Sequence, residues 1–337
     1  MDNKMKYRVL VVGCGTISHE WFPVLKKRPD CEICGVVDIN PEAAKERTAT
    51  YEVECPIYED YKIAIDELKP DVVVDLTFPK CHHDITVYAL RSGCHVFGEK
   101  PMAMNREDAL DMLKTAKETG KFYDVLQNRR FLTGVREMKE AIRNGMLGDI
   151  WMTCCEIYVN ADLSGGRNSL THPMLQDQAI HSFDTARFIL GCDATTVYAH
   201  SYNPKGSPYN GDGSGACIFE MQDGSVLVFN AVMGTSFLKT AWHSQWRVIG
   251  NRGTMTWNGF DDHAVCELMK EDGTIERTTI EANWKGIAWH EGAIDEMFTD
   301  LTAGVISEGS CYNNYGSVAM EFAALESVAA GAKVEVK

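Results

Sequence analysis

The sequence of 337 residues has no long hydrophobic run and no excess of positive charge. No segment approaches the roughly 18 consecutive apolar residues that a membrane-spanning helix needs. The formal net charge at neutral pH is −15, and an acidic chain repels nucleic-acid phosphates and anionic lipids. We therefore expect neither nucleic acid nor a membrane as a partner. Internal repeats and low-complexity linkers are also absent, which favours ordinary globular domains.

The N-terminus has no apolar stretch of the kind that directs secretion. The polar start "MDNKMKYR" is followed by only four apolar residues before Gly13, so we expect no signal peptide and a cytoplasmic protein. The 12 cysteines are scattered, as expected for small buried residues in a reducing compartment. Cys31 and Cys34 lie in a strand-like run, where residues three apart point to opposite faces, so we expect no metal site there.

Strand-like runs alternate with helical stretches from residue 7 to about residue 123. Runs such as "YRVLVVG" and "DVVVDLT" are almost continuously apolar, which is typical of parallel strands buried on both faces. The stretch "NPEAAKERTATY" begins with Asn40 as a helix N-cap and Pro41 at the first helical position. These features predict an α/β domain over residues 1–125, with a doubly wound parallel sheet.

The pattern changes after about residue 150 to short β runs such as "SVLVFNAVM" and "QWRVIG". One helix, over about residues 175–190, interrupts these runs early, and two helical stretches close the chain. We expect residues 126–337 to form an α+β domain with a mostly antiparallel sheet. Its last helix, over about residues 312–330, is expected to pack back on the first domain.

The segment "VVGCGTISHEW" joins the first predicted strand to the first predicted helix. Gly13 permits a tight turn there, and Gly15 lacks the Cβ that would keep a pyrophosphate away from the backbone. The amides around Thr16 and Ile17 lie at a helix N-terminus, where the helix dipole favours negative charge. Ser18 replaces the third glycine of a dinucleotide fingerprint and adds only a hydroxyl. The segment therefore predicts the phosphate-binding turn of a Rossmann domain.

Asp38 ends the second predicted strand, at about the spacing expected of the acid that binds the adenosine ribose. A carboxylate there accepts hydrogen bonds from the ribose hydroxyls and repels a 2′-phosphate. Lys45 and Arg47, in the following helix, are the cations that would contact such a phosphate. We predict NAD(H) as the cofactor, with NADP(H) as the weaker alternative.

A second signature, "SGCHVFGEKPMAMN", places Glu99-Lys100-Pro101 at the carboxyl end of the fifth predicted strand. Ligands of open α/β sheets bind at that edge. Together with "VVGCGTIS", "DLTFPKCHHD", "RRF" and "DQAIHSFD", this signature resembles the Gfo/Idh/MocA oxidoreductase family, which includes glucose–fructose oxidoreductase and inositol dehydrogenase. The resemblance spans essentially the whole chain.

The resemblance implies roles for individual residues. It places Lys100 against the substrate oxygen and the nearby cofactor, and it implies a cis Lys100–Pro101 bond. The family's Asp and His of a "D-x-G-x-H" helix fall on Asp177 and His181, with Ala179 in place of the glycine. The loop from Thr77 to His83 borders the adenine and pyrophosphate. The cofactor contacts expected from the fingerprint and the resemblance are Gly13, Gly15, Thr16, Ile17, Asp38, Thr77, Pro79, His83, Glu99 and Lys100.

The chemistry of these residue types also fits an oxidoreductase, independently of the family resemblance. Asp177 and His181 are four apart in a helical stretch and so lie on one face, and Asp184 continues that face and is a candidate to orient the imidazole. Histidine titrates near neutrality and is the usual base for an alcohol proton, whereas Lys100 can donate to a developing alkoxide. The alternative for His181 is a satisfied structural histidine.

Other polar residues give weaker signals. Arg129 and Arg130 begin the second domain, and one of them reaches the pocket or forms a salt bridge; we assign Arg130 to the substrate. The polar loop "NADLSGGRNSLTH" offers Asn160, Asp162 and His172, as substrate ligands or as solvated residues. The run "CHHD" resembles a metal cluster, but we interpret it as a loop with one cofactor-side histidine, His83.

These observations predict a two-domain NAD(H)-dependent oxidoreductase that oxidises a secondary hydroxyl of a sugar, polyol or glycoside, or reduces the matching ketone. Two alternatives are an NAD-retaining enzyme that cleaves glycosides without net redox change and a non-catalytic sensor of NAD or sugar. In runs such as "SVLVFNAVM" the residues that point to either face of the sheet are apolar, so we expect the second face of the sheet to be buried as well. We therefore expect a homodimer or homotetramer formed through this sheet, as the resemblance also implies.

Overall fold

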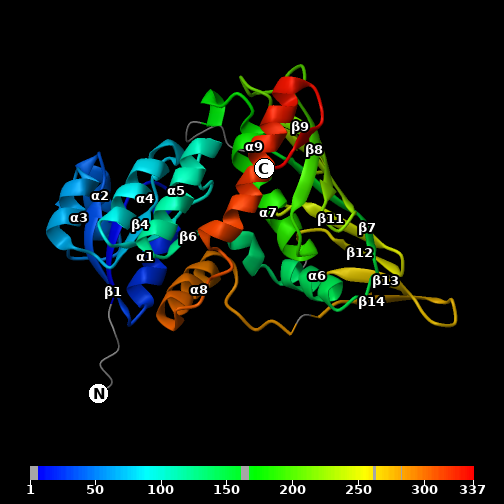
Figure 1. Ribbon diagram of the computed structural model, residues 1–337, viewed down its shortest axis with the longest axis horizontal. Coiled ribbons are helices and arrows are strands. Elements are labelled where there is room, and N and C mark those ends of the chain that lie inside the picture. The colour runs from blue at the N-terminus through cyan, green and yellow to red at the C-terminus, as the bar shows by residue number, and fades with distance from the viewer. Residues whose placement is uncertain (1–6, 161–166, 261–262, 282) are drawn as a thin grey trace. The chain divides into compact units, whose positions relative to one another are not determined.

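The computed structural model describes residues 7–160, 167–260, 263–281 and 283–337. The chain forms two compact units (Figure 1). The first contains residues 1–128 and 287–315, and the second contains residues 129–286 and 316–337. In the described part of the chain, no helix combines the length and apolar character that crossing a bilayer requires.

The first unit is built on a six-stranded sheet with the order β3-β2-β1-β4-β5-β6, in which all neighbouring strands are parallel. Strand β4 is buried along its whole length and the strands beside it are mostly buried, as their apolar sequences predict. The strand order reverses between β1 and β4, and ligands of such sheets bind beside that point at the carboxyl ends of the strands. The strands are β1 (Tyr7–Val12), β2 (Cys31–Val37), β3 (Ile57–Tyr58), β4 (Val72–Asp75), β5 (His95–Gly98) and β6 (Tyr123–Val125).

Helices connect these strands, and the predicted start of the second helix is confirmed. Asn40 caps it by accepting a hydrogen bond from the amide of Glu42 at 3.2 Å, and Pro41 occupies the first helical position. The helices of this unit are α1 (Ser18–Lys27), α2 (Pro41–Thr50), α3 (Tyr61–Leu68), α4 (His82–Arg91), α5 (Arg106–Thr119) and α8 (Trp289–Ala303). Short 3₁₀ turns occupy Pro79–Cys81 and Asn128–Phe131.

The second unit is built on a nine-stranded sheet with the order β14-β13-β12-β11-β7-β10-β9-β8-β15. It is mostly antiparallel, and β7 and β10 form its parallel pair. The strands are β7 (Ile150–Val159), β8 (Ala194–Tyr202), β9 (Ser214–Met221), β10 (Val226–Met233), β11 (Gln245–Gly250), β12 (Gly253–Trp257), β13 (Val265–Met269), β14 (Ile275–Thr279) and β15 (Val334–Glu335).

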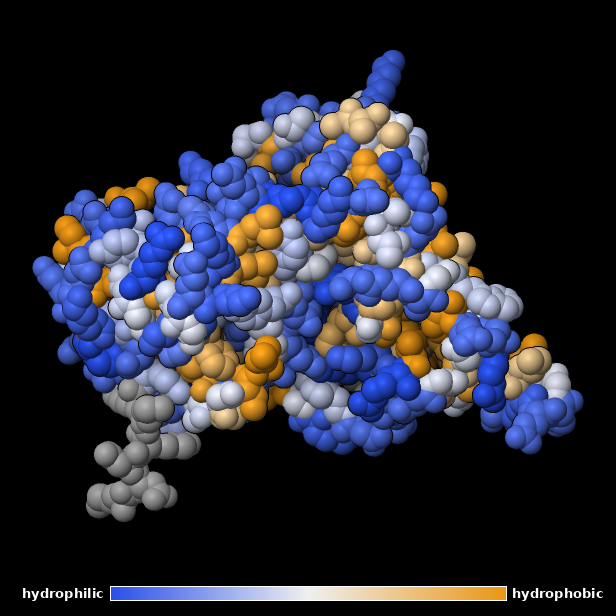
Figure 2. All heavy atoms as spheres, viewed as in Figure 1, coloured by the Kyte–Doolittle hydropathy of each residue, from blue (hydrophilic) through white to orange (hydrophobic). Residues whose placement is uncertain are grey.

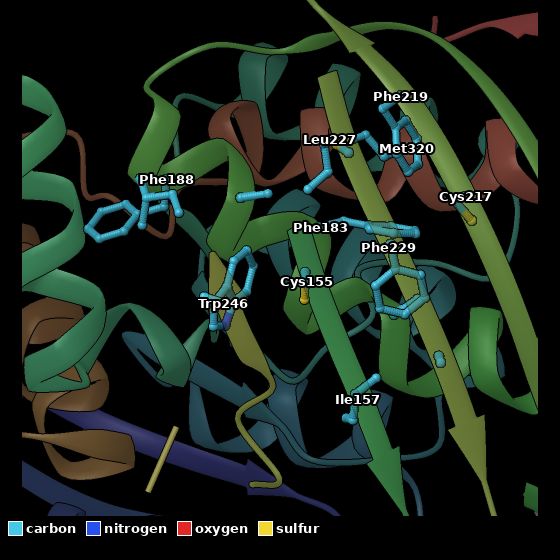
Figure 3. Packing of buried hydrophobic residues seen from close by; sticks show 14 of the residues in the cluster. Cys155, Ile157, Phe183, Phe188, Cys217, Phe219, Leu227, Phe229, Trp246 and Met320 are labelled. Carbon is cyan, nitrogen blue, oxygen red and sulfur yellow. The ribbon is translucent and has the colours of Figure 1, made fainter. Parts of the chain in front are cut away.

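Helices α6 (Thr133–Arg143), α7 (Ala179–Leu190) and α9 (Cys311–Ala330) lie on one face of this sheet (Figure 1). A π-helical turn, Met174–Gln178, leads directly into α7. Phe183 of α7 packs edge-on against Phe219 and Phe229 of the sheet, with ring centroids 4.9 and 5.2 Å apart (Figure 3). This aromatic contact fixes the helix that carries the predicted catalytic histidine.

The course of the last two helices differs from the predicted division at residue 125. Helix α8 belongs to the first unit, where it packs against α1. Helix α9 begins in the first unit and continues in the second from residue 316, where Met320, Ala323 and Ala324 are buried in the core; its packing on the first domain stays a prediction. Hydrophobic spacing identifies a buried helical face and leaves open which sheet covers it.

Candidate functional site

The glycine loop has the geometry expected of a pyrophosphate-binding turn. Gly13 has a φ of +101°, and a Cβ there would lie 2.8 Å from the carbonyl carbon of Leu76, so no other residue fits. A Cβ on Gly15 would meet no atom within 4 Å, which leaves open space beside the backbone. Ser18 is fully buried and donates its hydroxyl to the carbonyl of Gly15 at 2.6 Å. Among the described residues, no acceptor bonds to the amides of Thr16 and Ile17. These amides remain available to an anion at the start of α1.

The carboxylate of Asp38 faces this loop. Its Oδ2 accepts the amide of Cys14 at 2.7 Å, and its Oδ1 accepts the amide of Asn40 at 2.8 Å. Each carboxylate oxygen keeps a lone pair for a ribose hydroxyl. Lys45 is paired with Glu42 at 2.7 Å, and Arg47 donates to the carbonyl of Cys14 at 3.1 Å. The surroundings of Asp38 therefore fit two ribose hydroxyls better than a 2′-phosphate.

The buried His82 links the loop after β4 to the residues that follow β5. Thr77 donates its amide and hydroxyl to Asp75 Oδ1 at 3.0 and 2.6 Å, and the half-buried Pro79 opens the following turn. His82 is buried between the carbonyls of Thr77 and Pro101, at 3.1 and 3.0 Å. This loop thus lies beside the Lys100–Pro101 bond, which is cis as the resemblance implied.

Two carboxylates contact the side chain of His83, and its contact with the cofactor stays a prediction. Its ring nitrogens lie 2.9 Å from Asp84 Oδ1 and 3.0 Å from Asp111 Oδ2, so the side chain points to α5. Burial lowers the pKa of His83, but the hydrogen bonds to these two carboxylates outweigh that effect and raise it. The adjacent His82 takes the place beneath the loop, because the start of α4 turns neighbouring residues to different sides.

Glu99 and Lys100 follow β5 at the carboxyl edge of the parallel sheet. Glu99 is buried, and burial raises the pKa of its carboxyl. Its two oxygens accept hydrogen bonds from Trp21 Nε1 at 2.8 Å and from the amide of Lys100 at 3.3 Å. Glu99 therefore has an internal structural role as the acceptor that joins α1 to this turn. Lys100 is half-buried, and its positive charge lies close enough to Glu99 to favour the ionised carboxylate.

In the second unit, Asp177 and His181 lie on consecutive elements, the π-helical turn and α7. π-helical turns are rare and frequently occur at functional sites. Asp177 is half-buried and accepts a hydrogen bond from Gln178 Nε2 at 3.0 Å, whereas His181 is buried. A partly accessible carboxylate beside a buried imidazole is a suitable pair for holding a hydroxyl and removing its proton.

The two adjacent arginines have different surroundings. Arg130 and Asp184 are both almost fully buried and form a bidentate ion pair, with distances of 2.7 Å (Nε to Oδ2) and 2.5 Å (Nη2 to Oδ1). Asp184 also accepts the hydroxyl of Ser317 at 2.7 Å, so it stabilises Arg130 rather than orienting the imidazole of His181. Arg130 therefore forms the salt bridge that was one alternative for these arginines, and its contact with the substrate stays a prediction.

Arg129 differs from Arg130, although the sequence named both arginines and did not separate them. It is buried, and neither terminal guanidinium nitrogen has a hydrogen-bond partner among the described residues. Burial lowers its pKa to about 10, while the nearby Asp177 acts in the opposite direction. His243 lies close to the same guanidinium, and burial together with Arg129 lowers the pKa of His243 to about 4. Arg129, Asp177 and His243 therefore form one polar cluster.

The remaining predicted substrate residues lie on loops of the second unit. His172 Nδ1 lies 2.7 Å from Ser201 Oγ and 3.3 Å from Asp212 Oδ2, and Ser201 donates to the same Asp212 oxygen at 2.6 Å. Asn160 is exposed and donates to Ser236 Oγ at 3.4 Å. Asp162 lies outside the described residues. His172 is thus part of an internal network, and Asn160 remains accessible.

Comparisons with known proteins agree with this architecture. A family model described as "Oxidoreductase family, NAD-binding Rossmann fold" matches residues 7–127, and the "GFO/IDH/MocA C-terminal domain" matches residues 135–256. The chain is 30% identical over 213 residues to the D-glucoside 3-dehydrogenase of Escherichia coli (strain K12), a match that covers 59% of each protein. It is 28% identical over 257 residues to the 1,5-anhydro-D-fructose reductase of Ensifer adhaerens, covering 73% of this chain and 74% of that protein.

Solved structures extend the likeness of the fold to nearly the whole chain. Levoglucosan dehydrogenase, in complex with NADH and levoglucosan, superimposes with a TM-score of 0.87 at 20% sequence identity. That likeness covers 98% of this chain and 100% of the other. The matched residues, the glycine loop with Asp38 and the Glu99-Lys100-Pro101 turn together show that the chain belongs to the Gfo/Idh/MocA family of oxidoreductases.

Proposed function

We propose that the protein is an NAD(H)-dependent dehydrogenase that oxidises a secondary hydroxyl of a sugar, polyol or glycoside, or reduces the matching ketone. The observation that carries the proposal is the polar cluster beside α7. It combines the half-buried carboxylate of Asp177 with the Arg129 guanidinium and His243, and the buried imidazole of His181 lies one helical turn after Asp177. Buried donors and acceptors at this density suit a small ligand with several hydroxyls.

The residues around the glycine loop are proposed to hold the cofactor. The amides of Thr16 and Ile17 bind the pyrophosphate, and Asp38 accepts the ribose hydroxyls and disfavours NADP(H). The chemistry supplied by the dinucleotide when bound is hydride transfer.

Each of the three predicted catalytic residues has a separate role in the proposed reaction. His181 removes the proton from the substrate hydroxyl, and Lys100 donates a hydrogen bond to the alkoxide as it develops. Asp177 accepts a second hydroxyl and fixes the orientation of the substrate. Arg129 takes the substrate role that we first assigned to Arg130, because its guanidinium is not engaged by a carboxylate among the described residues.

The substrate class rests on relatives as well as on the site. D-glucoside 3-dehydrogenase, 1,5-anhydro-D-fructose reductase and myo-inositol 2-dehydrogenase are named for cyclic, hydroxyl-rich compounds. We propose a substrate of that class.

Two substitutions test the catalytic assignment. Once a panel of aldoses, inositols and glycosides has given a wild-type rate, Lys100→Met and His181→Ala should each lower kcat by roughly 10²–10⁴. Calorimetric NAD affinity should stay nearly unchanged, because neither side chain is assigned to the adenosine half. The double variant should lose less than the product of the single losses, since both residues serve one proton transfer.

Wild-type turnover by either single variant would remove that residue from the chemistry. If no polyol yields NADH and no ketone consumes it, the dehydrogenase proposal fails. Release of an aglycone without net NADH would then identify the redox-neutral enzyme, and ligand binding without turnover would identify the sensor.

A further inference from the structure

A buried amide and a buried imidazole meet at the carboxyl edge of the first unit. Asn128 begins the 3₁₀ turn after β6 and is 5% exposed, and His290 lies in the first turn of α8 and is 9% exposed. Asn128 Nδ2 lies 2.9 Å from His290 Nε2. The residue before His290, Trp289, has a φ of +66°, a strained conformation for so large a side chain. Such strain persists where the surrounding structure requires it, and it clusters at ligand sites.

His290 is a neutral hydrogen-bond acceptor toward Asn128. Burial, followed by the nearby charge of Lys100, lowers the pKa of its imidazole to about 4. Glu20 Oε2 lies 3.7 Å from Nδ1 and favours the tautomer with its proton there. Nε2 is then left without a proton and can only accept, so the NH₂ group of Asn128 must face it. His290 thus fixes which way the Asn128 amide points.

That orientation leaves the side-chain oxygen of Asn128 as the group without a donor. It is buried and has no hydrogen-bond partner among the described residues. Buried acceptors of this kind are uncommon in native proteins, because desolvation is then uncompensated. A ligand that carries a hydrogen-bond donor would complete the site.

The sheet order indicates which ligand group reaches Asn128. The strands run β2-β1-β4-β5-β6, with Asp38 after β2, the glycine loop after β1 and Lys100 after β5. A dinucleotide with its adenosine ribose at Asp38 and its pyrophosphate at the glycine loop extends toward β5 and β6. Asn128 lies beyond Lys100 in this direction, so the most distant part of the cofactor, the substituted nicotinamide ring, is the part that meets it.

We propose that the Asn128 side-chain oxygen accepts a hydrogen bond from the carboxamide of the nicotinamide ring, with His290 as the positioning residue that orients the Asn128 amide. The inference rests on the proposed NAD(H) function. It assigns selectivity at the nicotinamide end to two residues, one of which is contributed by a helix far along the chain.

The test compares three ligands by calorimetry on the intact protein. NAD⁺ carries the carboxamide, 3-acetylpyridine adenine dinucleotide has a methyl ketone in its place, and ADP-ribose lacks the ring. Asn128→Leu should weaken NAD⁺ binding by roughly five- to tenfold, the range for one net hydrogen bond, and leave ADP-ribose binding within about twofold. The preference of the wild type for NAD⁺ over the acetylpyridine analogue should disappear.

Variants of His290 separate positioning from folding. His290→Phe, which cannot accept a hydrogen bond, should lose the same preference, whereas His290→Gln keeps an acceptor and should retain most of it. Asn144→Leu, an exposed asparagine after α6, is the matched control and should change neither affinity.

The outcomes are distinct. Equal NAD⁺ affinity in Asn128→Leu and the wild type overturns the proposal, and so do parallel losses for NAD⁺ and ADP-ribose, which indicate a structural role. A wild type that binds neither ligand would refute the proposed cofactor function itself and this inference with it. Retained ADP-ribose binding in a variant that has lost its preference for the carboxamide supports the assignment.

Discussion

Arg129 and Arg130 show how two adjacent identical residues acquire different roles. Asp184 neutralises the charge of Arg130 in a buried bidentate ion pair. Removing either partner would leave the other charge buried and uncompensated, which strongly destabilises the folded state. Arg129 is equally buried, but its terminal nitrogens have no hydrogen-bond partner among the described residues. A buried charge in that state lowers stability and is retained for function.

Substitution of the two arginines should separate stability from activity. Arg129→Met removes a desolvated charge, so the Tm should stay the same or rise, while kcat/KM falls by about tenfold or more through a higher KM. Arg130→Met leaves the buried Asp184 carboxylate without its cationic partner and should lower the free energy of unfolding by about 3–5 kcal/mol. Thermal unfolding and steady-state kinetics check both. A large Tm loss in Arg129→Met with unchanged KM would show that our assignment is reversed.

Asp38 provides the prediction on cofactor choice. Asp38→Ala removes the acceptors for two ribose hydroxyls and the repulsion of a 2′-phosphate, so NAD(H) should bind more weakly and NADP(H) relatively better. Calorimetric Kd values for both cofactors measure the change, with Glu118→Ala, an exposed carboxylate on α5, as the control. If the wild type already prefers NADP(H) by about tenfold, roughly 1.4 kcal/mol, the argument from Asp38 is wrong.

Sequence spacing predicted residues whose role is tied to the backbone. Gly13, Gly15 and Asp38 are recognisable because strand, turn and helix follow each other at fixed intervals. Spacing did not separate His82 from His83 or Arg129 from Arg130, because contacts from distant segments decide which histidine is buried and which arginine is paired with a carboxylate. The Asp184 ion pair was missed for the same reason, since its partner is 54 residues away in the sequence.

At the scale of elements, periodicity identified most helices and strands and failed where geometry is irregular. The helix predicted over about residues 175–190 begins as a π-helical turn that contains Asp177, and apolar spacing alone cannot indicate such a turn. Helix α6 was overlooked, although its buried residues include Val135 and Met138. Helix α8 packs against α1 in the first unit, and this contact could not be predicted because the two helices are far apart in the sequence.

Strand β6 carries a titratable group that should make stability depend on pH. Asp124 is 1% exposed, and burial raises its pKa to about 7, although Ser307 donates its hydroxyl to Oδ2 at 2.7 Å. The folded state therefore binds this proton more tightly than the unfolded chain, whose ordinary value is 3.8. Its contribution is favourable at low pH and is lost as the pH rises toward about 7.

Asp124→Asn should remove this dependence. The variant should match the wild type in Tm near pH 4 and exceed it by a margin that grows up to about pH 7 and is constant above. Thermal unfolding across this range measures the margin, and Glu59→Gln, an exposed residue of the same unit, should show none. A margin that is constant with pH would show that Asp124 is ionised throughout.

At the scale of the whole molecule, the surface is uneven in character. On the face shown in Figure 2, hydrophilic residues predominate and hydrophobic ones lie in small groups, a pattern that needs no partner. The nine-stranded sheet differs, because its helices cover one face, and alternate residues of β10 on the other face remain half-exposed. Register places Tyr198, Ile218, Val228 and Cys154 side by side across four strands on that outer face.

This outer row is the basis of the prediction that the protein forms a dimer or tetramer through its second unit. Tyr198 and Ile218 are 47% and 50% exposed in the single chain, and burying such a row against a second copy removes apolar surface from water. A central lysine would instead have to be desolvated, so Ile218→Lys should shift the assembly toward monomer in sedimentation velocity at micromolar concentration. Leu110→Lys, at a 46% exposed position on α5, is the matched control and should leave the assembly intact. A wild-type monomer under these conditions would refute the prediction, and an Ile218→Lys protein that assembles like the wild type would place the interface elsewhere.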